Sequence, residues 1–207
     1  DYRCTFIKQE RIDGVVRPKQ TIEVLFRHKP FSVGFRWVDN PPRADRLLYV
    51  EGRYDGKMLV RPTGALARAI VPTAARDPEG AEAMAETLRP VTMFGFRRGL
   101  RNLLDVYRAA REAGDLDSDY AGKAEVDGRP ALVLVRTLPE KDAYPAKVTR
   151  VYIDEEYLVP VRIEATNWDD EFQALYVYRD IAFNVGLTDR DFQPENFDLV
   201  RPGGRKR

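Results

Sequence analysis

The chain has 207 residues, of which 43% are hydrophobic, so it can bury a sizeable core and wholesale disorder is excluded. Lys and Arg together number 34 and Asp and Glu 33, and this near-neutral balance argues against a nucleic-acid-binding protein. Cys4 and His28 are the single residues of their types, which excludes an intramolecular disulfide and removes most catalytic triads and transition-metal sites. No apolar run approaches the ~20 residues of a membrane helix.

The first third of the chain alternates between apolar and polar residues. Residues 21–28 and 31–38 are the clearest runs, and their period of two predicts half-buried antiparallel strands. Asp13-Gly14 and Asp55-Gly56 have the composition of two-residue hairpin turns, and Pro41-Pro42 marks a loop. The apolar residues that share a face in the two runs are Ile22, Val24 and Phe26, then Phe31, Val33, Phe35 and Trp37.

The middle of the chain changes to a helical period. Asp77 is a plausible N-cap with Pro78 at the first helical position, and Gly114 is a natural C-cap of the helix that follows. We therefore expect a helical insert at about residues 77–114, which would cover one face of a sheet. The apolar stripe of its longer helix is Phe96, Leu100, Leu103, Tyr107 and Ala110.

The last third returns to the strand pattern. Asp127-Gly128 predicts a hairpin turn, and residues 147–168 predict a further hairpin. About ten strands in sequential hairpins indicate a mainly β (α+β) fold, a large curved antiparallel sheet forming an unclosed barrel covered by one or two helices. We expect one such domain over residues 1–200 and a disordered basic tail at 201–207, for which an anionic surface is a weaker possibility.

Three consecutive acids, Asp154, Glu155 and Glu156, interrupt an otherwise apolar stretch. Clustered carboxylates can perform acid/base chemistry or bind Ca²⁺. A hairpin with a solvated acidic turn explains them more simply, because the residues on both sides alternate strongly. We therefore expect no catalytic residue, no metal site and no cofactor in this chain.

Two isolated residues and the start of the chain lead to further expectations. Cys4 alternates with Tyr2 and Phe6, so we expect a small buried hydrophobic side chain. His28 follows a strand with no nucleophile beside it, so we expect an exposed polar residue. The sequence starts abruptly at Asp1 inside a strand pattern, so we expect an export signal or a lipobox to have been removed.

Aromatic residues recur in the strands and at the start of the long helix. They have two interpretations, which the residues alone leave nearly even. One is ordinary core packing, to which aromatic side chains contribute heavily. The other is the lining of an apolar cavity between a curled sheet and a helix that does not fill it.

Four stretches of the sequence resemble the DUF1571 family of bacterial proteins. They are "TIEVLFRHKPFSVGFRWV", "LLYVEGRYDGKMLV", "RPVTMFGFRRGLRNLL" and "VYIDEEYLVPVRIEA", and the resemblance extends over nearly the whole chain. The run from Asp154 to Pro160 between two strands, together with "LTDRDF" near the end, is also distantly similar to periplasmic lipoprotein carriers of LolA/LolB-like fold. That resemblance implies a half-barrel with a helical lid over an apolar cavity. A protein of this kind carries acyl chains and catalyses no reaction.

From these observations we expect a non-enzymatic protein of the bacterial periplasm or cell envelope. It would hold a lipid, a lipoprotein acyl chain or another apolar ligand between the sheet and the helical lid. The alternative is an interaction or envelope stress-sensing module with a filled core, which binds an envelope protein. An enzyme is the third hypothesis. It ranks below the other two because no pair of carboxylates stands out as a catalytic site. The residues expected to line the ligand site are Phe26, Phe35, Trp37, Met93, Phe96, Leu100, Leu134, Tyr152 and Tyr176.

Overall fold

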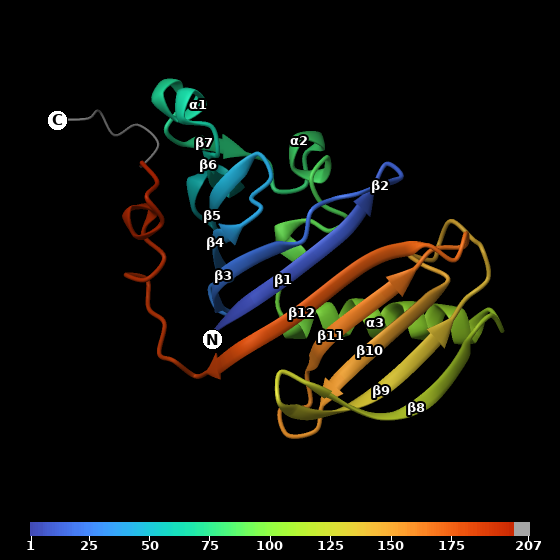
Figure 1. Cartoon of the computed structure of the whole chain (residues 1–207). Coiled ribbons are helices and arrows are strands. Elements are labelled where there is room, and N and C mark those ends of the chain that lie inside the picture. Colours follow the sequence, from blue (N-terminus) through green and yellow to red (C-terminus); the bar gives the residue numbers. More distant parts are fainter. Residues whose placement is uncertain (201–207) are drawn as a thin grey trace. The chain divides into compact units, whose positions relative to one another are not determined.

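The structure is a computed structural model that describes residues 1–200 (Figure 1). Within these residues the chain is mainly β, with a 12-stranded antiparallel sheet that does not close. Hydrogen-bonded neighbours follow the order β7-β6-β5-β4-β3-β1-β12-β11-β10-β9-β8, and β2 pairs with β1. This confirms the predicted fold class, while the predicted tail at 201–207 lies outside the described residues.

The elements have the following bounds. The strands are β1 (Tyr2–Ile12), β2 (Val15–Val16), β3 (Gln20–Arg27), β4 (Ser32–Asp39), β5 (Ala44–Val50), β6 (Met58–Pro62), β7 (Ala74–Arg76), β8 (Asp117–Val126), β9 (Arg129–Thr137), β10 (Val148–Asp154), β11 (Pro160–Thr166) and β12 (Phe172–Phe183). The α-helices are α1 (Ala65–Ile70), α2 (Ala81–Met84) and α3 (Phe96–Glu112), and the 3₁₀ turns are η1 (Tyr54–Gly56), η2 (Val91–Met93) and η3 (Pro194–Phe197).

The contacts within the chain divide it into two compact units. The first unit comprises residues 1–6, 19–94 and 180 onward, and the second comprises 7–18 and 95–179. The long strands β1 and β12 contribute residues to both units. The expectation of a single domain stays a prediction.

In the first unit, the segment that follows β12 covers one face of strands β4 to β6. Gly34 permits this, because a side chain at that position would overlap the ring of Phe197. Phe197 is thereby seated against Leu48, which is the cross-strand partner of Gly34. The buried cluster made in this way is Leu48, Val50, Leu59, Phe192, Phe197 and Leu199.

The opposite face of the first unit's sheet is packed with aromatic rings. Phe35 follows Gly34 in β4, so its side chain projects to the other side of the sheet. There the ring of Phe94, which follows η2, meets Phe35 at 4.9 Å, Phe6 at 5.3 Å and Phe26 at 6.0 Å between ring centroids. This side is a filled core in which edge-to-face contacts dominate.

Two of the three predicted hairpin turns are confirmed. Asp13-Gly14 and Asp127-Gly128 both have positive φ at each residue, as a type I′ turn requires, and both join directly paired strands. Asp55-Gly56 is not such a turn, and that prediction was wrong. β5 ends at Val50, and the N–H of Arg53 donates to the Val50 carbonyl (3.1 Å), which turns the chain out of the sheet before Asp55 is reached.

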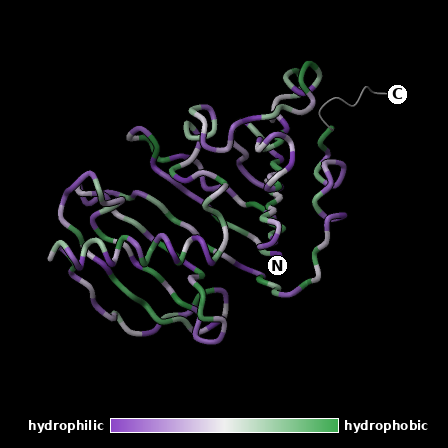
Figure 2. Tube along the Cα trace, turned by 180° about the vertical axis from the view of Figure 1, so that it is seen from behind, coloured by the Kyte–Doolittle hydropathy of each residue, from purple (hydrophilic) through white to green (hydrophobic). Residues whose placement is uncertain are grey.

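In the second unit, α3 lies over one face of the sheet, behind β9 to β12 in Figure 1 and in front of them in Figure 2. Its bounds agree with the helix that the apolar stripe predicted. The predicted insert at 77–114 therefore contains α3, preceded only by the four-residue α2 and by η2. α1, before the insert, was not predicted.

We predict that Gly34→Ala destabilises the protein by about 1–3 kcal/mol, because the new methyl group must displace the buried Phe197 ring. Urea denaturation of both proteins measures the difference in the free energy of unfolding. Gly99→Ala is the matched control, since a methyl group at Gly99 in α3 meets no atom within 4 Å, and we expect it to stabilise by up to about 1 kcal/mol. Equal unfolding midpoints for Gly34→Ala and the wild type would contradict the seating of Phe197 on Gly34.

Candidate ligand-binding site

The side of the sheet that α3 covers in the second unit can be followed across four strands. Leu134 pairs with Val151, Val151 with Ile163, and Ile163 with Tyr176. Directly paired residues project to the same side of an antiparallel sheet, so these side chains form one row. We call the row of Leu134, Val151, Ile163 and Tyr176, together with the neighbouring side chains that project with it, the α3 face.

The two ends of α3 are fixed to this unit by specific contacts. At its start, the buried ring of Phe96 lies 4.8 Å from the ring of Tyr178, the next residue after Tyr176 on the α3 face. At its end, Ala110 is fully buried against Leu138 and Tyr144. The helix is therefore held to this unit at both ends by buried side chains.

Between these two contacts, several apolar side chains remain partly accessible on both surfaces, although Val151 in the middle of the row is buried. Leu100 and Leu103 lie in α3 between Phe96 and Ala110, on the same apolar stripe, and are only half-buried. Opposite them, Ile163 and Tyr176 are half-buried and Leu134 is 39% exposed. Apolar surface that faces another element without being sealed by it is the composition expected of a ligand site.

Buried polar groups border the apolar row. Arg136, two residues after Leu134, donates from Nη2 to the hydroxyl of Thr149 (3.0 Å), and its guanidinium lies 5.0 Å from the ring centroid of Tyr107 in α3. Burial raises the pKa of the Tyr107 hydroxyl above its usual value. On the other side of the row, the Tyr176 hydroxyl donates to the carboxylate of Glu10 (2.6 Å).

The buried charge of Glu10 is compensated within the unit, as a buried charge must be. Lys8 forms an ion pair with Glu10 at 3.0 Å, and both side chains are almost fully enclosed. The sequence reasoning missed Arg136 and Glu10. A signal was present for Arg136, since it occupies the parity of Leu132 and Leu134 in an otherwise apolar strand.

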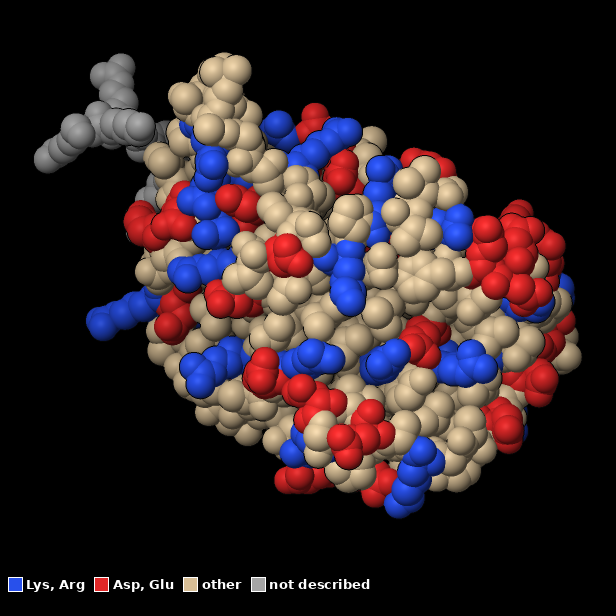
Figure 3. Space-filling view, viewed as in Figure 1, with Lys and Arg blue, Asp and Glu red and all other residues tan. Residues whose placement is uncertain are grey.

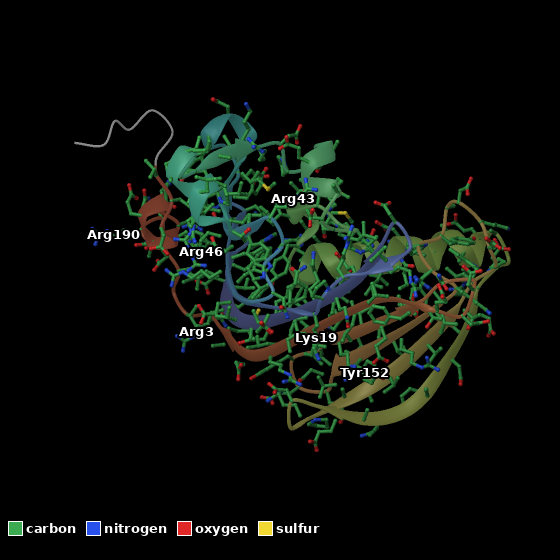
Figure 4. All side chains as sticks on the ribbon, turned by 45° about the horizontal axis from the view of Figure 1, so that its top comes forward. Arg3, Lys19, Arg43, Arg46, Tyr152 and Arg190 are labelled. Carbon is green, nitrogen blue, oxygen red and sulfur yellow. The ribbon has the colours of Figure 1, made fainter. Side chains whose placement is uncertain are left out.

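The structure places four of the predicted lining residues either on the α3 face or on the helix that covers it. They are Phe96, Leu100, Leu134 and Tyr176. Tyr152 lies elsewhere: it follows Val151 in β10 and so projects to the opposite side of the sheet (Figure 4). Its hydroxyl donates to the carboxylate of Glu164 (3.0 Å), below the guanidinium of Arg162.

The other predicted lining residues belong to the first unit. Phe26 and Phe35 are buried around Phe94 in the aromatic core. Trp37 is half-buried, and its indole N–H donates to the side-chain oxygen of Gln20 (2.8 Å). Met93 is half-buried in η2. Whether any of these residues contacts a ligand stays a prediction.

The acidic triplet is a hairpin turn, but it is not uniformly solvated as the sequence suggested. Asp154 ends β10 and is only 1% exposed, whereas Glu156 is 73% exposed. The carboxylate of Asp154 accepts backbone N–H groups of Glu156 (2.9 Å) and Tyr157 (2.7 Å) and two bonds from Arg129 (2.6 and 3.0 Å). Asp154 therefore fixes the turn, and every one of these bonds is structural.

Two further expectations from the sequence have clear outcomes. Cys4 is buried, as expected, and its burial strongly raises the pKa of its thiol, which leaves it protonated and unreactive. His28 is half-buried rather than exposed. Within residues 1–200, no three His, Cys, Asp or Glu side chains gather in an arrangement that could hold a metal ion.

The family model described as "Protein of unknown function (DUF1571)" matches residues 1–199. The chain belongs to the DUF1571 family. A comparison of this DUF1571 chain with curated proteins finds no match. Among residues 1–200, none of the helices combines the length and the apolar composition that crossing a membrane requires.

Two solved structures of MucB share the fold of this DUF1571 protein. The crystal structure of MucB matches with a TM-score of 0.52 at 15% identity and covers 93% of this chain, which in turn spans 56% of the MucB chain. The complex structure of Pseudomonas aeruginosa MucA/MucB gives the same TM-score and identity, with 93% of this chain and 54% of that chain covered. A LolA superfamily protein from Nitrosomonas europaea matches with a TM-score of 0.36 at 9% identity, covering 94% of this chain and 90% of its own.

We predict that Asp154→Asn destabilises the DUF1571 protein by about 1–3 kcal/mol at neutral pH, since Arg129 loses its buried charged partner. The guanidinium of Arg129 holds the pKa of Asp154 below its ordinary value of 3.8. A carboxyl group with a lowered pKa in the folded state stabilises the fold above its unfolded-state pKa, and this stability is lost as the pH falls through the folded-state pKa.

Urea unfolding midpoints measured between neutral pH and about pH 3 test this assignment. The wild type should lose more stability on acidification than Asp154→Asn does. Glu156→Gln, two residues along the turn and exposed, is the control, with an expected change within about 0.5 kcal/mol. Identical acid profiles for wild type and Asp154→Asn would contradict the role given to Asp154.

Proposed function

We propose that this DUF1571 protein is a non-enzymatic binding protein of the bacterial cell envelope, which holds the acyl chain of a lipid or lipoprotein, or another apolar ligand, between α3 and the sheet of the second unit. One observation carries the proposal. Apolar side chains on both facing surfaces, Leu100 and Leu103 on the helix and Ile163 and Leu134 on the sheet, stay accessible although α3 is fixed at both ends.

Binding of this kind needs no polar contact to be useful. Removing an acyl chain from water stabilises the complex by about 0.8 kcal/mol for each buried CH₂ group. A segment of six to eight methylene groups would therefore contribute roughly 5–6 kcal/mol before the entropic cost of binding. The paired polar groups around Arg136 and Glu10 border the apolar row and would limit how far the ligand extends along the sheet.

The proposed location rests on the similarity of the hairpin from Asp154 to Pro160 and of "LTDRDF" to the periplasmic lipoprotein carriers. The absence of enzymatic activity rests on the site's composition. The carboxylates of the acidic turn hold Arg129 and the backbone in place, and Glu10 is bonded to Lys8 and Tyr176. Screens with esters and glycosides should accordingly show no turnover.

A second candidate function is the binding of a protein partner. MucB, which shares the fold, has been solved in complex with MucA. The observation in this chain that favours a partner is β8, an edge strand of the sheet whose residues are almost all exposed. An exposed edge can accept an added strand through backbone hydrogen bonds. The register of β8 against β9 shifts between Tyr120 and Lys123, which limits continuous pairing on either side of the shift.

Native mass spectrometry of gently purified protein distinguishes the two candidates. A co-purified lipid mass supports the first. A polypeptide in fixed stoichiometry that is lost on Asp119→Lys supports the second, since an edge lysine discourages strand addition. Apo protein from several hosts, together with no uptake of a fluorescent fatty acid, would rule out the binding of an acyl chain.

We predict that Leu134→Asp lowers the affinity for a fluorescent fatty acid about tenfold or more, because a carboxylate is placed against the acyl chain. Leu134 is partly exposed, so the fold should tolerate the change. Leu158→Asp is the matched control, since Leu158 is 67% exposed in the turn between β10 and β11, and its affinity should equal that of the wild type. Equal affinities for both variants would place the ligand elsewhere.

A further inference from the structure

The solvent-facing side of α3 carries a line of arginines. The helix contains five arginines and two acids, so it carries a formal charge of +3, whereas the whole chain carries only +1. Residues that follow one another at spacings of four and three lie along one side of a helix. The set that does so here, which we call the arginine stripe, is Arg97, Arg101, Leu104, Arg108 and Arg111. All five side chains are exposed.

The arginine stripe extends over nearly the full length of α3. Its ends, Arg97 and Arg111, are about 21 Å apart along the helix axis at 1.5 Å per residue. Leu104 at its centre is 49% exposed. The half-buried Leu100 and Tyr107 of the apolar stripe lie next to it, at spacings of three and four residues. The arginine stripe therefore borders the side of the helix that faces the sheet.

Helix stability does not account for these arginines. The first turn of α3 contains no acid but carries Arg97 and Arg98, although the helix dipole disfavours cations at that end. Arg108 lies 3.7 Å from Asp105, but the two side chains are 70% and 61% exposed, and an ion pair of this kind contributes little. The positive charge of the arginine stripe is thus directed to the solvent, where it can act on an external anion.

The opposite side of the second unit's sheet has a different charge pattern. Figure 3 looks at the side away from α3 and shows Lys and Arg side chains mixed with Asp and Glu. On that side Arg162 forms an ion pair with Glu164, and Arg150 is the cross-strand partner of Glu164. Charge complementarity therefore favours α3, and not the open side of the sheet, as the surface that meets an anionic partner.

We propose that the arginine stripe docks α3 on an anionic phospholipid surface. Its guanidinium groups would contact lipid phosphates, and Leu104 would enter the boundary between headgroups and acyl chains. A straight, exposed line of about 21 Å suits a flat surface with many phosphates better than one small anion. Docking would bring the Leu100 side of the helix close to the membrane, whether or not a ligand occupies the α3 face.

Sedimentation with lipid vesicles tests this proposal on the full chain. The wild type should bind vesicles of equal parts phosphatidylglycerol and phosphatidylcholine at least tenfold more tightly than vesicles of phosphatidylcholine alone. The stripe variant, Arg101→Gln/Arg108→Gln/Arg111→Gln, should lose at least tenfold in partitioning to the anionic vesicles, because each basic residue near such a surface contributes to binding. Leu104→Ser should weaken the same partitioning about threefold or more.

The matched control is Arg3→Gln/Arg150→Gln/Arg190→Gln, which removes the same charge from three exposed arginines outside α3. At physiological ionic strength distant charges are screened, so the control should bind the anionic vesicles within about twofold of the wild type. Circular dichroism and fatty-acid uptake of the stripe variant should be unchanged. Failure of this proposal and failure of ligand binding are therefore distinguishable.

Three results with vesicles would overturn the proposal. They are a wild type that ignores both vesicle types, a stripe variant or Leu104→Ser protein that binds as well as the wild type, and a control that loses as much binding as the stripe variant. Binding of poly-L-glutamate without binding of vesicles would also overturn it, and would assign the arginine stripe to an acidic protein segment.

Discussion

The arrangement of the second unit depends on how α3 is attached to the sheet. Contacts hold it at both ends, Phe96 on Tyr178 at its start and Ala110 among Leu138 and Tyr144 at its end, and the Tyr107 ring lies against the guanidinium of Arg136. The helix is rich in arginine and its apolar stripe is narrow, so the stripe alone cannot seal the sheet. Attachment at the ends leaves the middle of the stripe, Leu100 and Leu103, facing the sheet without being enclosed by it.

The two units use their aromatic residues differently. In the first, Phe26 and Phe35 are packed around Phe94 with ring contacts that a core requires. In the second, the row that α3 covers is mainly aliphatic, and the one aromatic residue in it, Tyr176, is half-buried and bonded to Glu10. The core-packing interpretation of the aromatic residues therefore holds for Phe26 and Phe35 in the first unit, and the lining of an apolar cavity stays a prediction for the second.

Features set by local residue patterns were predictable from the sequence. The apolar spacing of three and four residues located α3. Two Asp-Gly pairs located hairpin turns, and the structure gives both residues of each pair a positive φ. Features set by contacts between distant residues were not. The burial of Asp154 depends on Arg129, which is 25 residues away, and the projection of Tyr152 away from α3 depends on the register of β10. α1 was missed because it has only six residues and buries none of them, so its sequence is too short to show an apolar stripe of helical period.

The edge strand β8 has a consequence for how molecules of this protein interact in concentrated solution. Its register shift falls at Ala121 and Gly122, and Gly122 has a φ of 90°. The shift divides the exposed backbone into two runs of about four residues, each too short to template a long cross-β pairing. The break in this outermost strand therefore limits the length over which a second molecule could extend the open sheet through backbone hydrogen bonds.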